Sequence, residues 1–362
     1  MKKVRLKKKV KYALILIFIC LVLIIATVIT YRINIGKVSN NDELVEFEVK
    51  EGESLSSLSK ALKEKNLIKS EFFYKLYLKL NNSSDLQVGI YSLSENMKVE
   101  EIVNILEGGT VSSKNVVTIT FKEGINMRQF ISLITEKTDI TEEEILSTLK
   151  DNIYLDELIN NYWFLSDEIK NPEIYYSLEG YLFPDTYEFQ RKSTIKEIFT
   201  IMLDHTSNKL EGYKNDLENS GYTIHQIMTL ASIIELEAAN SDDRSGVAGV
   251  FYNRLTSGWS LGSDVTTYYA IKVDMSERDL YQEELNQYNA YNTRCSEMAG
   301  KLPVGPICLP SIESIEAALY PTSHDYYYFV ADKNKKTYFS KTSAEHINIV
   351  NQLQRENLWY EY

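Results

Sequence analysis

The sequence contains 362 residues, of which 44% are hydrophobic and 25% charged, a composition that supports a sizeable core and excludes an intrinsically disordered chain. Its 51 acidic residues outnumber its 39 basic residues, so the formal net charge is −12 and the surface is a poor match for nucleic acid or anionic lipid. Only three cysteines are present, and no spacing of Cys and His resembles a zinc or haem site, so neither a metal nor another cofactor is expected.

A basic segment and then an uncharged run open the chain. Residues 1–11 hold seven Lys and Arg residues, whereas residues 12–31 hold no charge and would extend about 30 Å as a helix, the thickness of a bilayer core. We therefore expect a cytoplasmic basic tail over 1–11, a single transmembrane helix over 12–31 and a polar stalk over 32–44. The positive-inside rule then places the rest of the chain outside the cytoplasm, anchored to the cell membrane. A cleaved signal peptide is the alternative, but this segment lacks the small-x-small site that would follow a shorter apolar region.

A small α+β pattern follows over 45–109. Phe47 and Val49 alternate as in a strand, and a Lys-Glu-Gly turn leads to leucines at helical spacing. An aromatic helix, a second strand and a helix that ends at paired glycines complete the module, in the segments EFFYKLYLKL, LQVGIYSL and MKVEEIVNILEGG. The first domain boundary is expected between residues 109 and 115.

The rest of the chain, residues 116–362, begins with a related strand, turn and helix, VTITFKEGINMRQFISLI, which suggests a second copy of the same module. Beyond it, helical segments such as TEEEILSTLK and IKEIFTIMLDH mix with strand candidates such as HDYYYFVAD and KTYFS. These strands neither alternate strictly with helices nor recur at regular spacing. We therefore expect a larger, mixed α+β domain over 116–362 instead of a doubly wound sheet or a sandwich.

Two acids, Glu235 and Glu237, lie in the helical stretch LASIIELEAA. If Thr223 caps this helix and Gln226 completes a capping box, a rotation of about 100° per residue places Glu235 within the apolar stripe and Glu237 on the opposite face. An inward carboxyl group loses solvation when it ionises, which suits a group that donates a proton near neutral pH. Glu237 is expected to be solvated or to act as a capping residue.

Each candidate also has a structural interpretation. Glu235 is equally compatible with an ion pair to a buried arginine, such as Arg254 or Arg294, that merely holds the fold. Asp264 and Asp185 are candidates for a second acid, but each lies beside a Gly or Pro where an Asx turn is common. The four histidines are isolated from one another in the sequence, so none is favoured as a base or a metal ligand.

Aromatic residues crowd the loops that hold these acids. For about half of them core packing is the simpler explanation, yet a groove lined by Tyr, Asn and Asp around one protonated acid suits a polyhydroxylated chain such as a carbohydrate. The chain has no G-x-S-x-G elbow, no phosphate loop of the P-loop type and no G-x-G-x-x-G segment. The aromatic residues concerned are Tyr181, Phe183, Tyr187, Tyr268, Tyr269 and Tyr291.

A series of motifs recurs in a fixed order: VKEG, LEGYLFPDTYEF, LASIIELEA, VFYNRL, LGSDVTTYYA, AYNTR, LPVGPI, YYFVAD and FSKTSAEHINIV. Together with the basic tail and the apolar run, they resemble the YceG-like family of membrane-anchored endolytic murein transglycosylases of bacteria. The resemblance covers nearly the whole chain. The sequence departs from it at Val304, where the family often has Pro, and at Arg294, where an aromatic or polar residue is common.

The resemblance implies a lyase that cuts the β-1,4 bond between N-acetylmuramic acid and N-acetylglucosamine within nascent peptidoglycan strands and leaves a 1,6-anhydro end. It places the catalytic glutamate at Glu235, which would protonate the glycosidic oxygen and then deprotonate the muramoyl C6 hydroxyl, so that no second acid is needed. It also implies a LysM-like module over 45–109, a catalytic domain over 116–362, a part in cell wall assembly that can end glycan elongation, and coupling to polymerases such as penicillin-binding proteins. Substrate contacts are expected from Asp264, Asn292, Thr293, Glu179, Tyr181 and Asn253.

Two other functions fit the same residues. A muramidase would use water, with Asp264 or Asp185 as its second carboxylate. A noncatalytic scaffold would bind the wall without cutting it. The sequence alone does not pair Cys295 with Cys308, whose spacing allows a disulfide but does not require one.

Overall fold

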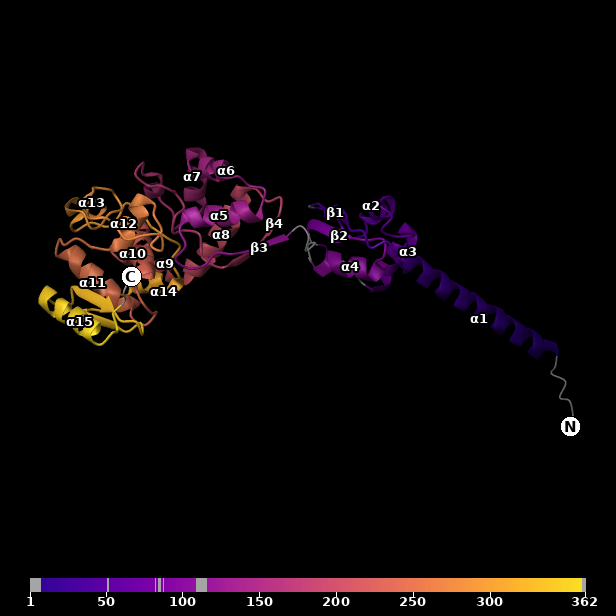
Figure 1. Ribbon diagram of the computed structural model, residues 1–362. Coiled ribbons are helices and arrows are strands. Elements are labelled where there is room, and N and C mark those ends of the chain that lie inside the picture. The colour runs from indigo at the N-terminus through magenta and orange to yellow at the C-terminus, as the bar shows by residue number, and fades with distance from the viewer. Residues whose placement is uncertain are drawn as a thin grey trace, which may run out of the picture. The chain divides into compact units, whose positions relative to one another are not determined.

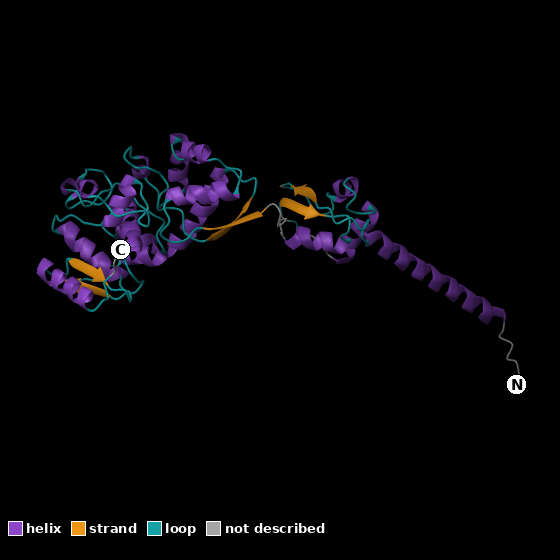
Figure 2. Ribbon diagram, viewed as in Figure 1, coloured by secondary structure: helices purple, strands orange, loops and turns teal. Residues whose placement is uncertain are grey.

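A computed structural model describes residues 8–50, 52–81, 83, 86, 88–108 and 116–359. The chain divides into two compact units, unit 1 over Met1–Val117 and unit 2 over Thr118–Tyr362 (Figure 1). Each unit combines helices with short two-stranded sheets (Figure 2). The α+β class is therefore as predicted. The expected boundary at 109–115 and residues 1–7 of the expected basic tail lie outside the described residues.

The prediction of a transmembrane helix over 12–31 is wrong. Helix α1 (Lys8–Ile35) covers that segment, but in the described part of the chain no helix combines the length and the apolar character that crossing a membrane requires. The single-pass topology and the cell-membrane location were inferred from this span, so the same finding contradicts both predictions.

Unit 1 is built around one antiparallel strand pair. Strand β1 (Val45–Val49) pairs with β2 (Gly89–Leu93), with Phe47 opposite Tyr91. Phe47 and Val49 are buried and their neighbours are exposed, which is the alternation that the sequence shows. Helices α2 (Ser59–Glu64), α3 (Glu71–Asn81) and α4 (Val99–Gly108) supply further apolar side chains of this core.

The first half of unit 2 has a strand pair and a group of helices. Strands β3 (Val116–Thr120) and β4 (Thr186–Gln190) pair with each other. The helices are α5 (Met127–Lys137), α6 (Glu142–Thr148), α7 (Asn152–Asn161), η1 (Asp167–Lys170), α8 (Ile195–Leu210), η2 (Glu211–Tyr213) and α9 (Lys214–Asn219).

The second half of unit 2 surrounds helix α10 (Ile224–Glu237), which contacts α11 (Arg244–Thr256), α12 (Asp264–Ile271) and α14 (Ile312–Leu319) (Figure 1). Strands β5 (Tyr328–Ala331) and β6 (Thr337–Ser340) form an antiparallel hairpin. The remaining elements are α13 (Gln282–Asn286), η3 (Ser296–Met298) and α15 (Ser343–Arg355).

Helix α10 begins as predicted, but its packing differs from the prediction. Thr223 and Gln226 form the expected capping box, with the Thr223 side chain accepting from the Gln226 N–H group. However, every residue from Ile227 to Ile234 is buried, so the helix has no solvent face along this length. The polar members Thr229 and Ser232 are accommodated because their hydroxyls donate to backbone carbonyls of the helix itself.

Candidate active site

Glu235 lies in the last turn of α10, with its carboxyl group at the N-terminus of α14. Its Oε2 atom accepts hydrogen bonds from the Ser311 N–H at 2.9 Å, the Ser311 Oγ at 2.5 Å and the Ser314 Oγ at 2.7 Å. The positive end of the α14 dipole adds to the attraction for a carboxylate. The Glu235 side chain is only 7% exposed, so its position is fixed by these contacts.

An arginine completes this arrangement. The Arg244 Nη2 atom, at the start of α11, lies 3.1 Å from Glu235 Oε1, and the Arg244 side chain is 14% exposed. An ion pair with a buried arginine therefore exists, as the structural interpretation expected, but the partner is neither Arg254 nor Arg294. The Arg244 Nε atom is buried and has no hydrogen-bond partner in the structure, so this side chain holds an unused donor beside the acid.

A further acid, Glu123, interacts with Glu235. Glu123 lies in the turn between β3 and α5, which is tied to the Leu309 carbonyl by the Gly124 N–H at 2.9 Å. Burial raises the pKa of the Glu123 carboxyl, the negative charges of Glu235 and Glu313 raise it further, and Arg244 opposes them. Arg244 therefore pairs with Glu235 and also acts electrostatically on Glu123.

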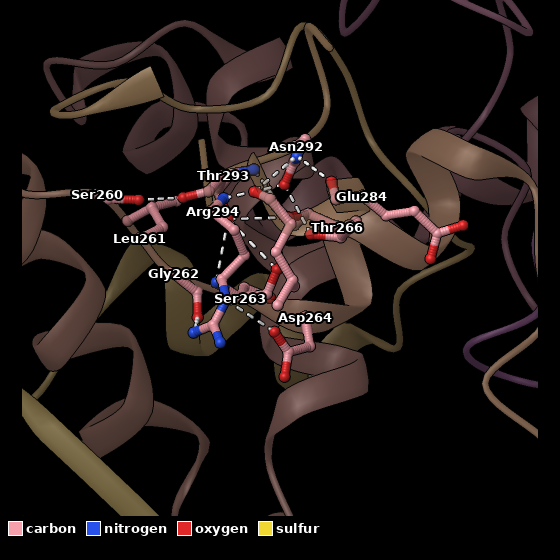
Figure 3. Close-up of polar contacts among 12 residues, drawn as sticks. Ser260, Leu261, Gly262, Ser263, Asp264, Thr266, Glu284, Asn292, Thr293 and Arg294 are labelled. Carbon is pink, nitrogen blue, oxygen red and sulfur yellow. Dashed lines mark hydrogen bonds and ion pairs between the residues drawn. The ribbon is translucent and has the colours of Figure 1, made fainter. Parts of the chain in front are cut away.

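Glu237, the last residue of α10, is half-buried. The Ser263 Oγ atom donates to Glu237 Oε1 at 2.6 Å. Burial raises the pKa of the Glu237 carboxyl, and Asp264 adds to this, while the Ser263 hydrogen bond and the two nearby arginines act in the opposite direction. Asp264 itself pairs with the Arg294 Nε atom at 2.9 Å, and its side chain is 55% exposed (Figure 3). The expected contact of Asp264 with a substrate stays a prediction.

A family assignment follows from these motifs and from a comparison with known proteins. The profile of the YceG-like family matches residues 47–352, which is most of the chain.

The chain belongs to the YceG-like family.

Relatives within the YceG-like family carry a common name. An endolytic murein transglycosylase of Bacillus subtilis (strain 168) is 33% identical over 306 residues, 83% of this chain and 82% of that protein. An endolytic murein transglycosylase of Streptococcus pneumoniae (serotype 2, strain D39) is 29% identical over 325 residues, and the match covers 85% of this chain and 58% of that protein. A crystal structure of a yceG-like protein from Listeria monocytogenes is 32% identical and superposes with a TM-score of 0.59, covering 85% of this chain and all of that one.

Asn292 and Thr293, in the YceG-like motif AYNTR, are buried and bonded to other protein groups. Asn292 Oδ1 accepts from Thr267 Oγ1 at 2.7 Å, and its Nδ2 donates to the carbonyls of Glu284, Leu285 and Gln287, at the C-terminal end of α13. Thr293 Oγ1 accepts from the Ser263 N–H at 3.1 Å and contacts Thr266 Oγ1 at 2.8 Å (Figure 3). Their expected contact with substrate stays a prediction. Through these hydrogen bonds Thr293 holds the segment that leads to Asp264.

The other expected substrate residues also have protein partners. Glu179 is 1% exposed and accepts from the Met127 N–H and the Tyr269 hydroxyl, both at 2.9 Å. The buried Tyr181 hydroxyl lies 2.8 Å from His225 Nδ1. Asn253 Nδ2 donates to the carbonyls of His324 and Tyr326, on the chain that leads into β5. Their roles toward a substrate stay predictions.

The remaining sequence-level candidates lie elsewhere. Asp185 Oδ2 pairs with His205 Nε2 at 3.0 Å, next to strand β4. Cys295 and Cys308 are both buried free thiols. The two departures from the YceG-like pattern have defined contacts, because Arg294 binds Asp264 and the Val304 carbonyl lies 2.8 Å from His225 Nε2.

Sequence reasoning missed the groups that hold Glu235: Arg244, Ser311 and Ser314. Ser311 lies four residues after the LPVGPI motif and directly after Pro310, and a Ser that caps a helix after a proline is a usable signal for a helix N-terminus. Nothing in the sequence, however, indicates which distant side chain that N-terminus receives. Glu123 was overlooked because its KEG turn was read only as a connection between a strand and a helix.

Proposed function

We propose that this chain is an endolytic murein transglycosylase, a lyase acting on peptidoglycan glycan strands, with Glu235 as its single acid and base. The relatives that bear this name are 33% and 29% identical over most of the chain. Within the strand, the bond cut is the β-1,4 linkage from N-acetylmuramic acid to N-acetylglucosamine, in keeping with a part in cell wall assembly.

The reaction balances without water. Glu235 gives its proton to the glycosidic oxygen as the bond from the muramoyl C1 to that oxygen breaks. The muramoyl C6 oxygen then bonds to C1, and its proton passes to the Glu235 carboxylate, which restores the acid. Because the nucleophile belongs to the substrate, the protein needs to orient the sugar but not a water molecule.

The single observation that supports this proposal best is the hydrogen bonding of Glu235. Ser311 Oγ and Ser314 Oγ both lie within 2.7 Å of Glu235 Oε2. A hydroxyl can donate to a carboxylate or turn and accept from a protonated carboxyl group. The same two serines therefore suit both protonation states through which a single acid and base must pass.

A water-using muramidase is the competing enzyme. Asp185 and Asp264, the second carboxylates expected for it, are paired with His205 and Arg294. The negative charge of Glu235 helps to raise the pKa of the Glu123 carboxyl, so the two acids interact. Glu123 would therefore be the candidate base of such a hydrolase. The mass of the products separates the two reactions.

The test is mass spectrometry of glycan fragments released from purified peptidoglycan by the wild-type chain and by Glu235→Gln. We expect fragments with 1,6-anhydro ends from the wild type and a rate at least about 100-fold lower for the variant, since a general acid and base contributes that much or more. Glu188→Gln, the same change at an exposed position on β4, is the matched control and should cut at the normal rate. Products heavier by one water would support the muramidase, and an active Glu235→Gln protein would remove Glu235 from its role.

Unit 1 is proposed to be a LysM-like module over 45–109 that binds peptidoglycan, next to a catalytic domain over 116–362. The resemblance of its VKEG segment to the family supports this assignment. Coupling to glycan polymerases such as penicillin-binding proteins is proposed on the same ground, and copurification of such a polymerase with the full chain would test it.

A further inference from the structure

An exposed aromatic cluster lies beside the loop that carries Asp264. Trp259, between α11 and α12, is 44% exposed, a high value for the largest apolar side chain. Its ring centre lies 4.9 Å from that of Tyr327 and 6.1 Å from that of Tyr328, at the start of β5. We name these three side chains the Trp259 platform.

The backbone under Trp259 is held on both sides. Its N–H donates to the Arg254 carbonyl at 2.8 Å, and its carbonyl accepts from the Gly300 N–H at 2.8 Å. Gly258 has φ +70°, and a Cβ atom on Gly300 would come within 3.1 Å of the Gly258 Cα. The two glycines therefore suit this close crossing, which fixes the backbone that carries Trp259.

One arginine joins the platform to the loop. The Arg254 Nε atom donates to the Tyr327 carbonyl at 2.7 Å, its Nη1 atom donates to the Leu261 carbonyl, and its guanidinium lies 5.5 Å from the centre of the Tyr328 ring. This side chain stiffens both tyrosines relative to the loop. A rigid aromatic surface binds with a smaller loss of conformational entropy than a flexible one.

The same loop connects the platform to the C-terminal end of α10, the helix that carries the candidate acid. Ser260 Oγ and the Gly262 N–H both donate to the Thr293 carbonyl (Figure 3). Ser263 Oγ then donates to Glu237, which lies two residues after Glu235 on α10. Ser263 lies four positions after Trp259 in the chain, so the platform is at most roughly 14 Å of extended chain from this contact. A glycan chain of a few sugars can span such a distance.

We propose that the Trp259 platform is a glycan-binding subsite, where one sugar ring of the strand cut at Glu235 stacks on the exposed face of Trp259. Sugar C–H groups carry partial positive charge and are attracted to the negative face of an aromatic ring. The exposed Asp264 and its partner Arg294, on the adjoining loop, offer polar groups for the hydroxyl and acetamido substituents. This inference rests on the proposed function, because it assigns the platform to the same substrate.

The test measures binding without cleavage. Glycan strands freed of their stem peptides are titrated into the Glu235→Gln chain, and the apparent Kd is compared with that of Glu235→Gln carrying Trp259→Ala or Trp259→Phe. We expect Trp259→Ala to weaken binding about tenfold and Trp259→Phe to keep most of the affinity. Tyr320→Ala, which removes another half-exposed aromatic ring at the far end of α14, is the matched control and should leave the Kd unchanged.

Fluorescence gives a second measurement that does not depend on a destabilised variant. The chain has three tryptophans, so a change in emission on adding strands should disappear in Trp259→Phe and persist in Trp359→Phe. In the otherwise wild-type chain, Trp259→Ala should raise KM and leave kcat nearly constant, since the platform does not touch the reacting bond. An unchanged Kd and an unchanged KM in Trp259→Ala would overturn the subsite while anhydro products kept the proposed function. Absence of anhydro products would instead remove the function.

Discussion

At the scale of single residues, Ser311 has two separate tasks. Its N–H and Oγ both donate to Glu235 Oε2, and its Oγ also caps α14 by accepting from the Ser314 N–H at 3.3 Å. Loss of the Ser311 hydroxyl therefore removes one hydrogen bond to Glu235 and the N-terminal cap of α14. The backbone N–H survives any substitution, so the acid is not left without a donor from α14.

We expect Ser311→Ala to lower kcat/KM about tenfold, because one of several donors to Glu235 is lost, and to lower the free energy of unfolding by about 1 kcal/mol through the lost cap. Thr194→Ala is the matched control, since Thr194 caps α8 in the same way without touching Glu235. Its stability should fall by a similar amount while kcat/KM stays constant. Equal loss of activity in both variants would mean that Ser311 acts only through stability. Release of glycan fragments and thermal unfolding are the two measurements.

At the scale of elements, Glu179 joins two helices. It accepts from the N–H of Met127, the first residue of α5, and from the hydroxyl of Tyr269 in α12. The Glu179 Oε1 atom is buried without a hydrogen-bond partner. The Nη1 atom of Arg128, in α5, is also buried without a hydrogen-bond partner. Burial raises the pKa of the Glu179 carboxyl to about 7, above its ordinary value of 4.5, while the two hydrogen bonds and Arg128 oppose the shift.

The raised pKa predicts the direction of a pH effect on stability. Between about pH 4.5 and pH 7 the folded state binds more protons at Glu179 than the unfolded state does, so the free energy of unfolding falls as the pH rises through this window. The loss amounts to at most about 3 kcal/mol by pH 8. We expect Glu179→Gln, which keeps an acceptor and stays neutral, to show a flatter stability profile from pH 5 to pH 8 in denaturant titrations.

Glu188→Gln, an exposed change on β4, serves as the control and should follow the wild-type profile. A Glu179→Gln profile as steep as that of the wild type would show that the carboxyl is already ionised in the folded protein at pH 5. The interpretation of Glu179 as a neutral link between α5 and α12 would then be wrong.

At the scale of the whole molecule, the sequence predicted what depends on neighbours in the chain. The capping box of α10, the alternation in β1 and the α+β class all follow from local patterns. The burial of α10 on every side could not be predicted, because helical phase considers only the polarity of the side chains of the helix itself. Thr229 and Ser232 look polar in the sequence, but their hydroxyls donate to carbonyls within the helix and can be buried. Arg244, Ser311 and Ser314 were missed because they reach Glu235 from other elements. The transmembrane prediction rested on the length and the lack of charge of residues 12–31, and it is contradicted because no helix among the described residues is long and apolar enough to cross a membrane.

The division of the chain into two compact units also predicts how the molecule unfolds. Unit 1 has its own buried apolar cluster, in which Leu62 is fully buried, and unit 2 has a separate one that includes Leu203 of α8. A unit with its own core generally unfolds as its own cooperative transition. Calorimetry of the full chain should therefore show two transitions.

We expect Leu62→Ala, which removes about 2–5 kcal/mol of packing free energy, to lower the temperature of one transition by on the order of 10 °C and to leave the other in place. Leu203→Ala should do the converse. If unit 1 binds the wall as a LysM-like module, Leu62→Ala should also sediment less with insoluble peptidoglycan near its lowered transition, while the cutting of soluble strands by unit 2 continues at the wild-type rate. A shift of both transitions by Leu62→Ala would instead mean that the two cores unfold as one cooperative structure.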